Sequence, residues 1–297
     1  MFLLELCLGS IERSDMEIQM VDEVVCICCG NRSWVLEHEL PPFLFNRRAS
    51  IYRCIVCGCG CTYPQPPIAL SFYEENTQYD ALFAGKESLY VEFARQLIRF
   101  VGCGKANEKS LLDVGCGGGF LVQAAIDSGY QAVGLEVNTK MVTWASGKGL
   151  PVIQGDVEAL VKNSDRLYDV IVLSAILEHL EKPIELLSNC QKILAPDGVI
   201  VVSQASYDGL LPKILPWGWY GWQPEQHYWH FTPSSFLEMA GSVGLKAEKM
   251  ERSSLYHPWF VQGDTKTIIG RNLATLIARI GNAFHKGDSF NVVLRSA

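Results

Sequence analysis

From residue 110 onward, short apolar runs alternate with segments whose apolar residues have helical spacing. Runs of this length bounded by glycine, proline or polar residues are typical of buried strands. The expected strands are 110–114, 131–136, 151–154, 168–174, 199–204, 245–251 and 289–295. Because each of the first five is followed by a helical pattern, the chain is expected to form an α/β fold with a doubly wound, seven-stranded Rossmann-like sheet.

Helix ends are marked by residues that suit them. Pro183 fits the first turn of one helix, and Thr232 fits the N-cap of another that ends at Gly244. A helix is expected near 268–285, between the last two strands. Residues 72–102 also have one apolar face and are expected to be helical ahead of the first strand.

The loop after the first strand is rich in glycine. It runs from Asp113 through Gly115, Gly117 and Gly119 into Phe120. Glycine allows positive φ and lets a ligand approach the backbone closely. The nicotinamide fingerprint requires glycine at the first, third and sixth positions, and the sixth is Phe120 here. The spacing therefore argues against a dehydrogenase.

Two further acidic residues follow the next strands. Glu136 ends the second strand, and Asp156 follows the third. Ligands of such sheets bind beyond the carboxyl ends of the strands, where Glu136 can accept hydrogen bonds from ribose hydroxyls. Taken singly, Asp113 could be a strand-end cap, Glu136 a solvated carboxylate and Asp156 a turn residue. Their joint spacing favours a ligand site.

Eleven cysteines are present, and seven of them lie between Cys26 and Cys61. Two C-x-x-C-G knuckles supply Cys26, Cys29, Cys54 and Cys57. Two knuckles complete a tetrahedral four-cysteine site, which predicts a zinc ribbon. Reduced buried thiols are the alternative. Three other cysteines could replace one of these ligands: Cys28, Cys59 and Cys61.

The charge and the cysteine content indicate which binding partners and which cellular compartment to expect. The net charge of −7 among 297 residues makes a nucleic-acid partner unexpected, because domains that bind phosphate backbones are usually basic. An odd number of cysteines without a secretory signal favours a reducing compartment, and we expect the cytoplasm. No apolar run of about 18 residues is present, so no membrane span is expected. The sequence does not specify an oligomeric state.

The motifs together resemble class I S-adenosylmethionine-dependent methyltransferases, in the branch with an N-terminal four-cysteine zinc ribbon (methyltransferase domain 23/11-like). The matching segments are 112–117, 134–136, 155–156, 168–171, 177–180 and 194–198, with 57–73 and 221–237 matching that branch. Pro196-Asp197-Gly198 departs from the usual Pro-Gly-Gly. The resemblance implies S-adenosylmethionine and structural zinc as cofactors. The cofactor would be held by Asp113, Gly115, Cys116, Gly117, Glu136, Asp156, Val157 and Ser174.

The domain boundaries follow from these assignments. We expect a leader that need not be ordered over 1–22, a zinc ribbon over 23–68 and a methyltransferase domain over 69–297. Within the methyltransferase domain, we expect N-terminal lid helices over 72–102, an aromatic acceptor loop over 206–231 and a helical insertion over 252–287.

Methyl transfer to a hydroxyl needs positioning and a base. His179 follows the fourth strand, and His227 lies in the loop after the fifth. Both are candidate catalytic residues, and a structural histidine bonded to backbone is the alternative for each. Glu178 is expected to be structural, and His230 has no assigned role.

Aromatic side chains are concentrated in 206–231. They could form an acceptor pocket or lid, or they could cover the sheet end or a subunit contact. Tyr73 and Tyr79 could close over the cofactor.

The function expected from the sequence is methyl transfer to an oxygen, or less readily a carbon or nitrogen, of a small metabolite or sugar. An RNA base methyltransferase is the first alternative. The acidic charge and the absence of an Asn/Asp-Pro-Pro-Tyr motif at 174–177 argue against it. A non-catalytic zinc-ribbon adaptor is the second alternative, and the intact glycine loop and Glu136 argue against that.

Overall fold

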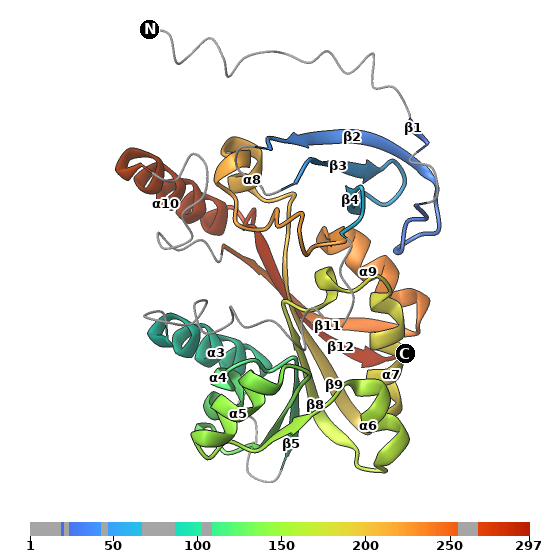
Figure 1. The fold of residues 1–297 in the computed structure, drawn as a ribbon, viewed down its shortest axis with the longest axis vertical. Helices are drawn as coiled ribbons and strands as arrows, with labels where there is room; N and C mark the ends of the chain where they lie inside the picture. The colour runs from blue at the N-terminus through green and yellow to red at the C-terminus, as the bar shows by residue number, and fades with distance from the viewer. Residues whose placement is uncertain (1–18, 21–23, 43–46, 67–86, 103–108, 255–266) are drawn as a thin grey trace, which may run out of the picture.

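The computed structural model describes residues 19–20, 24–42, 47–66, 87–102, 109–254 and 267–297. Two sheets organise these residues (Figure 1). A seven-stranded sheet forms one end of the molecule, and a smaller antiparallel sheet lies at the other, beside helices α8 and α10.

The large sheet has the order β11-β12-β9-β8-β5-β6-β7. Its strands are β5 (Ser110–Val114), β6 (Gln131–Glu136), β7 (Val152–Gln154), β8 (Tyr168–Ser174), β9 (Leu194–Ala205), β11 (Leu245–Ser253) and β12 (Ser289–Ser296). The first five pair in parallel, and β12 pairs antiparallel with both β9 and β11. The expected α/β class and seven strands are confirmed. Strand order reverses at β5, and ligands of such sheets bind at that switch point.

Helices cover both faces of this sheet. One face carries α3 (Glu87–Val101), α4 (Phe120–Asp127) and α5 (Thr139–Gly147) (Figure 1). The opposite face carries α6 (Val157–Asn163), α7 (Pro183–Lys192) and α9 (Pro233–Ser242). The helix expected over 72–102 begins at Glu87 in the described residues, and Tyr73 and Tyr79 lie outside them.

Local sequence sets where these helices begin. The Thr232 hydroxyl accepts from the Ser235 amide in a reciprocal capping box at the start of α9, as expected. Pro183 occupies the first turn of α7, and Gly244 has φ +76° just after α9. The helix expected over 268–285 is α10 (Ile268–Ala283).

The small sheet contains strands from both ends of the sequence. Its order is β1 (Gln19–Met20), β2 (Ser33–Leu40), β3 (Ala49–Cys54), β4 (Gly60–Tyr63) and β10 (Trp229–His230). Strand β10 comes from the segment after β9, and Trp229 pairs with Cys61. The ribbon sheet is therefore wider than residues 23–68. Strand β1, from within the expected leader, pairs with β2 at one edge of the sheet, and β10, from the methyltransferase domain, pairs with β4 at the other. Both strands therefore use backbone groups that would otherwise be unpaired at the edges.

The ribbon also shares a hydrophobic core with the large sheet. Trp34 and Cys54 belong to the same buried cluster as Leu112, Trp229 and Phe231. The opposite face of the large sheet packs a separate cluster with α3 and α4. Apolar burial therefore contributes directly to holding the ribbon against the methyltransferase domain.

Most aromatic side chains of 206–231 pack between the ribbon and the helices beside it. Trp219 and Trp222 are buried in a cluster with Ile51 of β3, α8 (Leu210–Ile214) and α10. The Trp219 indole donates to the Asp288 carboxylate at 2.9 Å. These tryptophans pack against the ribbon sheet. Other residues of 206–231 line a cavity described below, so the acceptor role of this loop stays a prediction.

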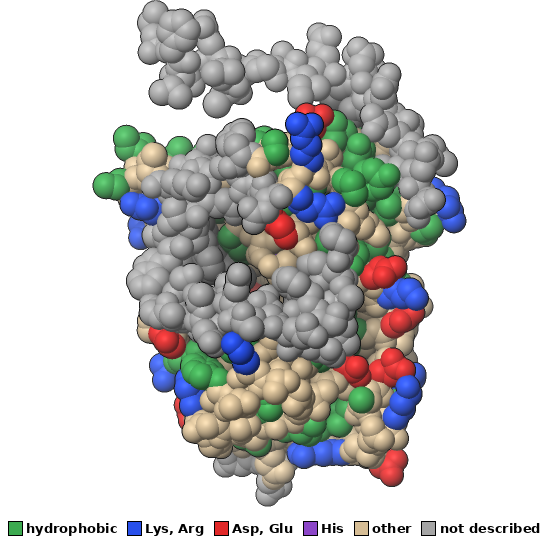
Figure 2. Space-filling model, in the orientation of Figure 1, with side chains coloured by type: hydrophobic (Ala, Val, Ile, Leu, Met, Phe, Trp, Pro, Cys, Tyr) green, Lys and Arg blue, Asp and Glu red, His purple; other side chains and the backbone are tan. Residues whose placement is uncertain are grey.

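Charges of both signs are mixed on the surface. Figure 2 shows acidic and basic side chains interspersed along the edge near α6 and α7, where Lys162 pairs with Glu158 and Lys182 pairs with Glu185. No helix of the described residues combines the length and apolar character needed to cross a membrane.

Candidate active site

The glycine loop after β5 has the backbone that its sequence predicts. Gly115, Gly117 and Gly119 have φ of +69°, +49° and +74°. The Gly115 amide donates to the Leu135 carbonyl at 2.8 Å, which fixes the loop on β6. A Cβ on Gly115 would lie 2.8 Å from Ile176 Cδ1, so alanine is disfavoured there by both backbone and space.

Glu136 connects this loop to the end of β6. Its Oε2 accepts from the Gly117 amide and its Oε1 from the Asn138 amide, both at 2.8 Å. The carboxylate is buried. Because each carboxylate oxygen can accept two hydrogen bonds, the two backbone bonds orient Glu136 and leave acceptor capacity for ligand hydroxyls.

Asp113 lies beside Glu136 and is 3% exposed. Burial, followed by the nearby Glu136 carboxylate, raises the pKa of Asp113 to about 8. A positively charged ligand group beside Asp113 would favour the ionised carboxylate. The Cys116 side chain packs under the loop, since a Cβ on Gly134 would lie 2.4 Å from its Sγ. Cys116 therefore offers only its backbone to a ligand.

The other predicted cofactor residues do not all lie beside the glycine loop. Asp156 caps α6, with its Oδ1 accepting from the Ala159 amide at 2.7 Å. Val157 is buried in the core. Ser174, at the end of β8, lines a separate cavity. The ligand roles of these three residues stay predictions.

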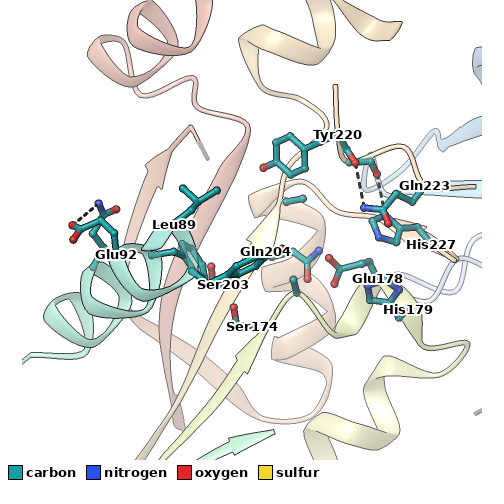
Figure 3. A pocket seen from close by; sticks show the side chains of 16 residues that line it. Leu89, Glu92, Ser174, Glu178, His179, Ser203, Gln204, Tyr220, Gln223 and His227 are labelled. Atoms are coloured by element: carbon teal, nitrogen blue, oxygen red, sulfur yellow. Dashed lines mark hydrogen bonds between the residues drawn. The ribbon is translucent and has the colours of Figure 1, made fainter. Parts of the chain in front are cut away.

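That cavity has a volume of about 340 Å³. It lies between α3 and the carboxyl ends of β8 and β9 (Figure 3). Its lining includes Tyr90, Phe93, Ser174, Gln204, Tyr220 and His227. Among the tyrosines and tryptophans of 206–231, Tyr220 lines the cavity and the others do not.

The cavity brings His179 and His227 together. His179 ends the short 3₁₀ helix η2 (Leu177–His179), and its ring centroid lies 4.6 Å from that of His227. His227 Nδ1 donates to the Gly221 carbonyl at 2.9 Å, so in the neutral ring Nε2 carries the lone pair. Burial lowers the pKa of His179 to about 4 and lowers that of His227 well below its ordinary value. Both rings are therefore neutral near pH 7.

Backbone contacts hold the two histidine segments side by side. The Tyr228 amide donates to the Glu178 carbonyl at 2.8 Å, and the Trp229 indole donates to the Glu181 carbonyl at 3.1 Å. Next to them, His230 Nε2 and Thr62 Oγ1 are 2.9 Å apart. The ribbon strand β4 therefore helps to position His227, and His230 has a structural contact.

Glu178 points into the same region (Figure 3). Burial raises the pKa of Glu178 to about 7, while a hydrogen bond from the Gln204 side chain lowers it. Its Oε2 is buried without a hydrogen-bond partner among the described residues, and so is Gln204 Oε1. Buried polar atoms in this state mark a place where a ligand can satisfy them.

Sequence reasoning missed Gln204 and the wall formed by α3. A signal for Gln204 was present, because Ser203-Gln204 ends an apolar run at the carboxyl end of a strand. The α3 residues that line the cavity, such as Leu89 and Phe93, had been read only as one apolar helix face. Their position depends on packing that spacing does not reveal.

The four knuckle cysteines meet at the end of the small sheet. One Sγ from each of Cys26, Cys29, Cys54 and Cys57 lies within 4.8 Å of the others. The Cys26–Cys57 and Cys29–Cys54 sulfur pairs are 3.4 and 3.6 Å apart, near the ~3.8 Å of sulfurs around a tetrahedral zinc. A second group shares Cys26 and adds Cys28 and Cys59. Of the three alternative ligands named from the sequence, Cys28 and Cys59 thus lie close enough to compete, whereas Cys61 belongs to neither group.

Two curated proteins are similar in sequence to about half of this chain. The chain is 29% identical over 157 residues to the ubiquinone biosynthesis O-methyltransferase of Vibrio cholerae, covering 47% of this chain and 62% of that protein. It is 32% identical over 155 residues to the protein of that name from Aliivibrio fischeri, covering 46% and 64%. The matches thus span less than two thirds of these curated relatives.

Solved structures support the fold. A SAM dependent methyltransferase from Archaeoglobus fulgidus has a TM-score of 0.53 at 20% identity, covering 72% of this chain and 98% of that chain. Magnesium protoporphyrin IX methyltransferase from Synechocystis, with bound SAH, has a TM-score of 0.52 at 15% identity, covering 76% and 97%. The methyltransferase domain model matches residues 86–249, more than half of the sequence. The chain belongs to the methyltransferase domain family.

Proposed function

We propose that this protein transfers a methyl group from S-adenosylmethionine to an oxygen of a small metabolite or sugar. The observation that carries the proposal is the adjacency of two sites. A glycine loop follows β5, and the buried carboxylates of Asp113 and Glu136 lie at the ends of β5 and β6. A cavity with two neutral imidazoles borders the ends of β8 and β9, and β8 pairs directly with β5. The relatives named O-methyltransferases support oxygen as the atom methylated.

On the donor side, the residues suit S-adenosylmethionine. When bound, this cofactor supplies an electrophilic methyl group on a positively charged sulfur. Glu136 is oriented by two backbone amides and retains acceptor capacity for ribose hydroxyls. Asp113 would attract the ammonium group, and Gly115 and Gly117 carry no side chain that would keep a ligand away from the backbone. We assign Cys116, Asp156 and Val157 to the same site from their positions after β5 and β7.

On the acceptor side, a cavity of about 340 Å³ suits a small molecule. Ser174, at the end of β8, lines this cavity, and we assign it to the cofactor from its place on the strand next to β5. His179 and His227 are the catalytic candidates because they line the cavity and are neutral near pH 7. Lone pairs on neutral imidazoles can assist loss of the acceptor proton. A cavity of about 340 Å³ and an acidic chain favour a small molecule over RNA.

Structural zinc is the second proposed cofactor. Sulfur separations of 3.4 and 3.6 Å among Cys26, Cys29, Cys54 and Cys57 support it. The cysteines of the described residues carry no disulfide, which suits a reducing compartment such as the cytoplasm.

The test uses S-adenosylmethionine with a labelled methyl group and a metabolite extract. We expect labelled small molecules and S-adenosylhomocysteine to form together. Gly115→Ala and Glu136→Ala should abolish both products, whereas Glu158→Ala, on the exposed face of α6, should not. Full activity in both of the first two variants would overturn the cofactor assignment. Cofactor binding without turnover of any acceptor would favour the non-catalytic adaptor.

A further inference from the structure

Three side chains beside the acceptor cavity form a group suited to a metal ion. One ligand atom from each of Glu178, His179 and His227 lies within 4.8 Å of the other two. Ligand atoms bound to one cation at about 2.1 Å lie roughly 3 to 4 Å apart. The group thus needs a contraction of at most about 1 to 2 Å to close around a cation.

The carboxylate has an unused oxygen at this position. Glu178 and Gln204 both line the cavity, and Oε2 of Glu178 has no partner within the described part of the chain. Glu178 is 3% exposed. Leaving a carboxylate oxygen buried and unsatisfied is costly. A cation would remove that cost, whereas a purely structural role for Glu178 leaves it unexplained.

The two imidazoles are held as metal ligands usually are. His227 donates its Nδ1–H to the Gly221 carbonyl at 2.9 Å, and His179 forms a hydrogen bond with the Gln226 backbone. Metal-binding histidines commonly donate one ring N–H to a backbone carbonyl, which fixes the ring and leaves the other nitrogen for the metal. Burial also keeps both rings neutral, the form that ligates.

We propose that Glu178, His179 and His227 bind one divalent transition-metal cation at the wall of the acceptor cavity. Two imidazoles and one carboxylate suit manganese or zinc and leave coordination positions open for oxygen atoms of an acceptor. This inference rests on the proposed function and deepens it. A cation held there would place positive charge near the acceptor oxygen and favour loss of its proton, and the two histidines would then act as metal ligands in place of acting as bases.

This site differs in chemistry from the cysteine cluster. The cluster offers only thiolates, which favour zinc, whereas the new site offers nitrogen and oxygen. Mn²⁺ binds thiolates poorly and can therefore report the new site in a protein whose ribbon is filled with zinc.

The experiment is a titration of the zinc-loaded protein with Mn²⁺, followed by electron paramagnetic resonance. The unmodified protein should bind one Mn²⁺ per chain, with nitrogen coupling from imidazole. Glu178→Gln and His227→Asn should each weaken binding by at least about tenfold. Glu92→Gln is the matched control, because Glu92 also lines the cavity but pairs with Arg99, and it should bind like the unmodified protein.

Thermal melting and S-adenosylhomocysteine binding of each variant, measured by calorimetry, separate loss of the site from loss of the fold. Absent Mn²⁺ binding, or equal binding in folded Glu178→Gln, would overturn the metal inference. If methyl transfer persists in that case, the proposed function stands alone. If Mn²⁺ binds as expected but the protein binds no S-adenosylhomocysteine, the cation site stands and the proposed function fails.

Discussion

The donor and acceptor halves of the site are built in different ways. The donor half consists of one loop and the ends of β5 and β6, which are adjacent parallel strands. Gly117 and Glu136, 19 residues apart, are joined by a single hydrogen bond. The acceptor half joins η2, the segment around His227 and α3, with ribbon strand β4 behind them.

This difference has a functional consequence. Backbone groups on a compact scaffold suit a ligand shared by a whole family. Side chains from distant segments can change independently, which suits an acceptor that differs between members. Changes in the donor half should therefore abolish binding of the cofactor, whereas changes in the acceptor half should alter turnover and leave that binding intact.

The largest expected effect is in the acceptor half. Replacing His227 with alanine should lower turnover by about 10²- to 10⁴-fold, because a group that assists proton loss is removed. S-adenosylhomocysteine affinity, measured by calorimetry, should change less than about twofold. His285→Asn, an exposed histidine with φ +54° that asparagine tolerates, is the control. Equal losses of turnover and cofactor affinity would erase the distinction between the halves.

Glu136→Ala should have the next largest effect, now in the donor half. It removes the proposed ribose ligand and two charge-assisted hydrogen bonds, one from Gly117 in the loop and one from Asn138 after β6, each worth about 1.5–3 kcal/mol. Calorimetry should show S-adenosylhomocysteine affinity reduced by about 100-fold or more. Glu158→Ala is the control. Retained affinity would mean that Glu136 only supports the loop.

The third expected effect is a pH dependence of S-adenosylhomocysteine affinity, which arises in the donor half. Because the pKa of Asp113 is raised to about 8, the free protein holds a proton there that a bound ammonium would expel. S-adenosylhomocysteine affinity should therefore rise from roughly pH 5 to 7, by up to about tenfold per unit. Calorimetry in two buffers would also detect the released proton.

The proton on Asp113 also affects the stability of the protein without a ligand. The pKa of Asp113 is higher in the folded chain than in the unfolded chain, so its contribution to the free energy of unfolding falls as pH rises from about 4 through 8. Asp113→Asn should flatten both pH dependences. A steep affinity profile in that variant would assign the titration to another group.

The smallest expected effect tests the contact between the ribbon and the acceptor half. A Cβ on Gly60 would lie 3.0 Å from Cβ of His230, so Gly60→Val should displace β10 at a cost of about 1–3 kcal/mol. Acceptor turnover should fall severalfold while S-adenosylhomocysteine affinity is kept. Thr62→Val at the neighbouring position provides a comparison that removes only the His230 hydrogen bond. Unchanged turnover in both variants would mean that β4 does not position His227.

Sequence alone predicted the donor half well, because its determinants are local. Glycines at 115, 117 and 119 required positive φ, and the runs from Ser110 to Val114 and Gln131 to Glu136 are the strands expected. The acceptor half was harder. His179 and His227 were named, but their 4.6 Å approach depends on hydrogen bonds between segments about 50 residues apart.

Glu178 shows most directly why the rest could not be predicted. The sequence around Glu178 is also what a structural carboxylate would have. Its buried, unsatisfied oxygen results from tertiary packing, which brings Gln204 and His227 next to it. The pairing of β10 with β4 was equally hidden, because a two-residue strand has no periodicity to detect.

That pairing has a consequence for synthesis of the chain. The backbone edge of β4 emerges from the ribosome more than 160 residues before Trp229 and His230. At common translation rates of 5–20 residues per second, the edge waits on the order of 10 to 30 s for its partner. If the four cysteines bind zinc as proposed, that zinc would help to keep the ribbon ordered during this interval. Cells short of zinc should therefore lose this protein during translation, before a complete chain exists to be inactivated.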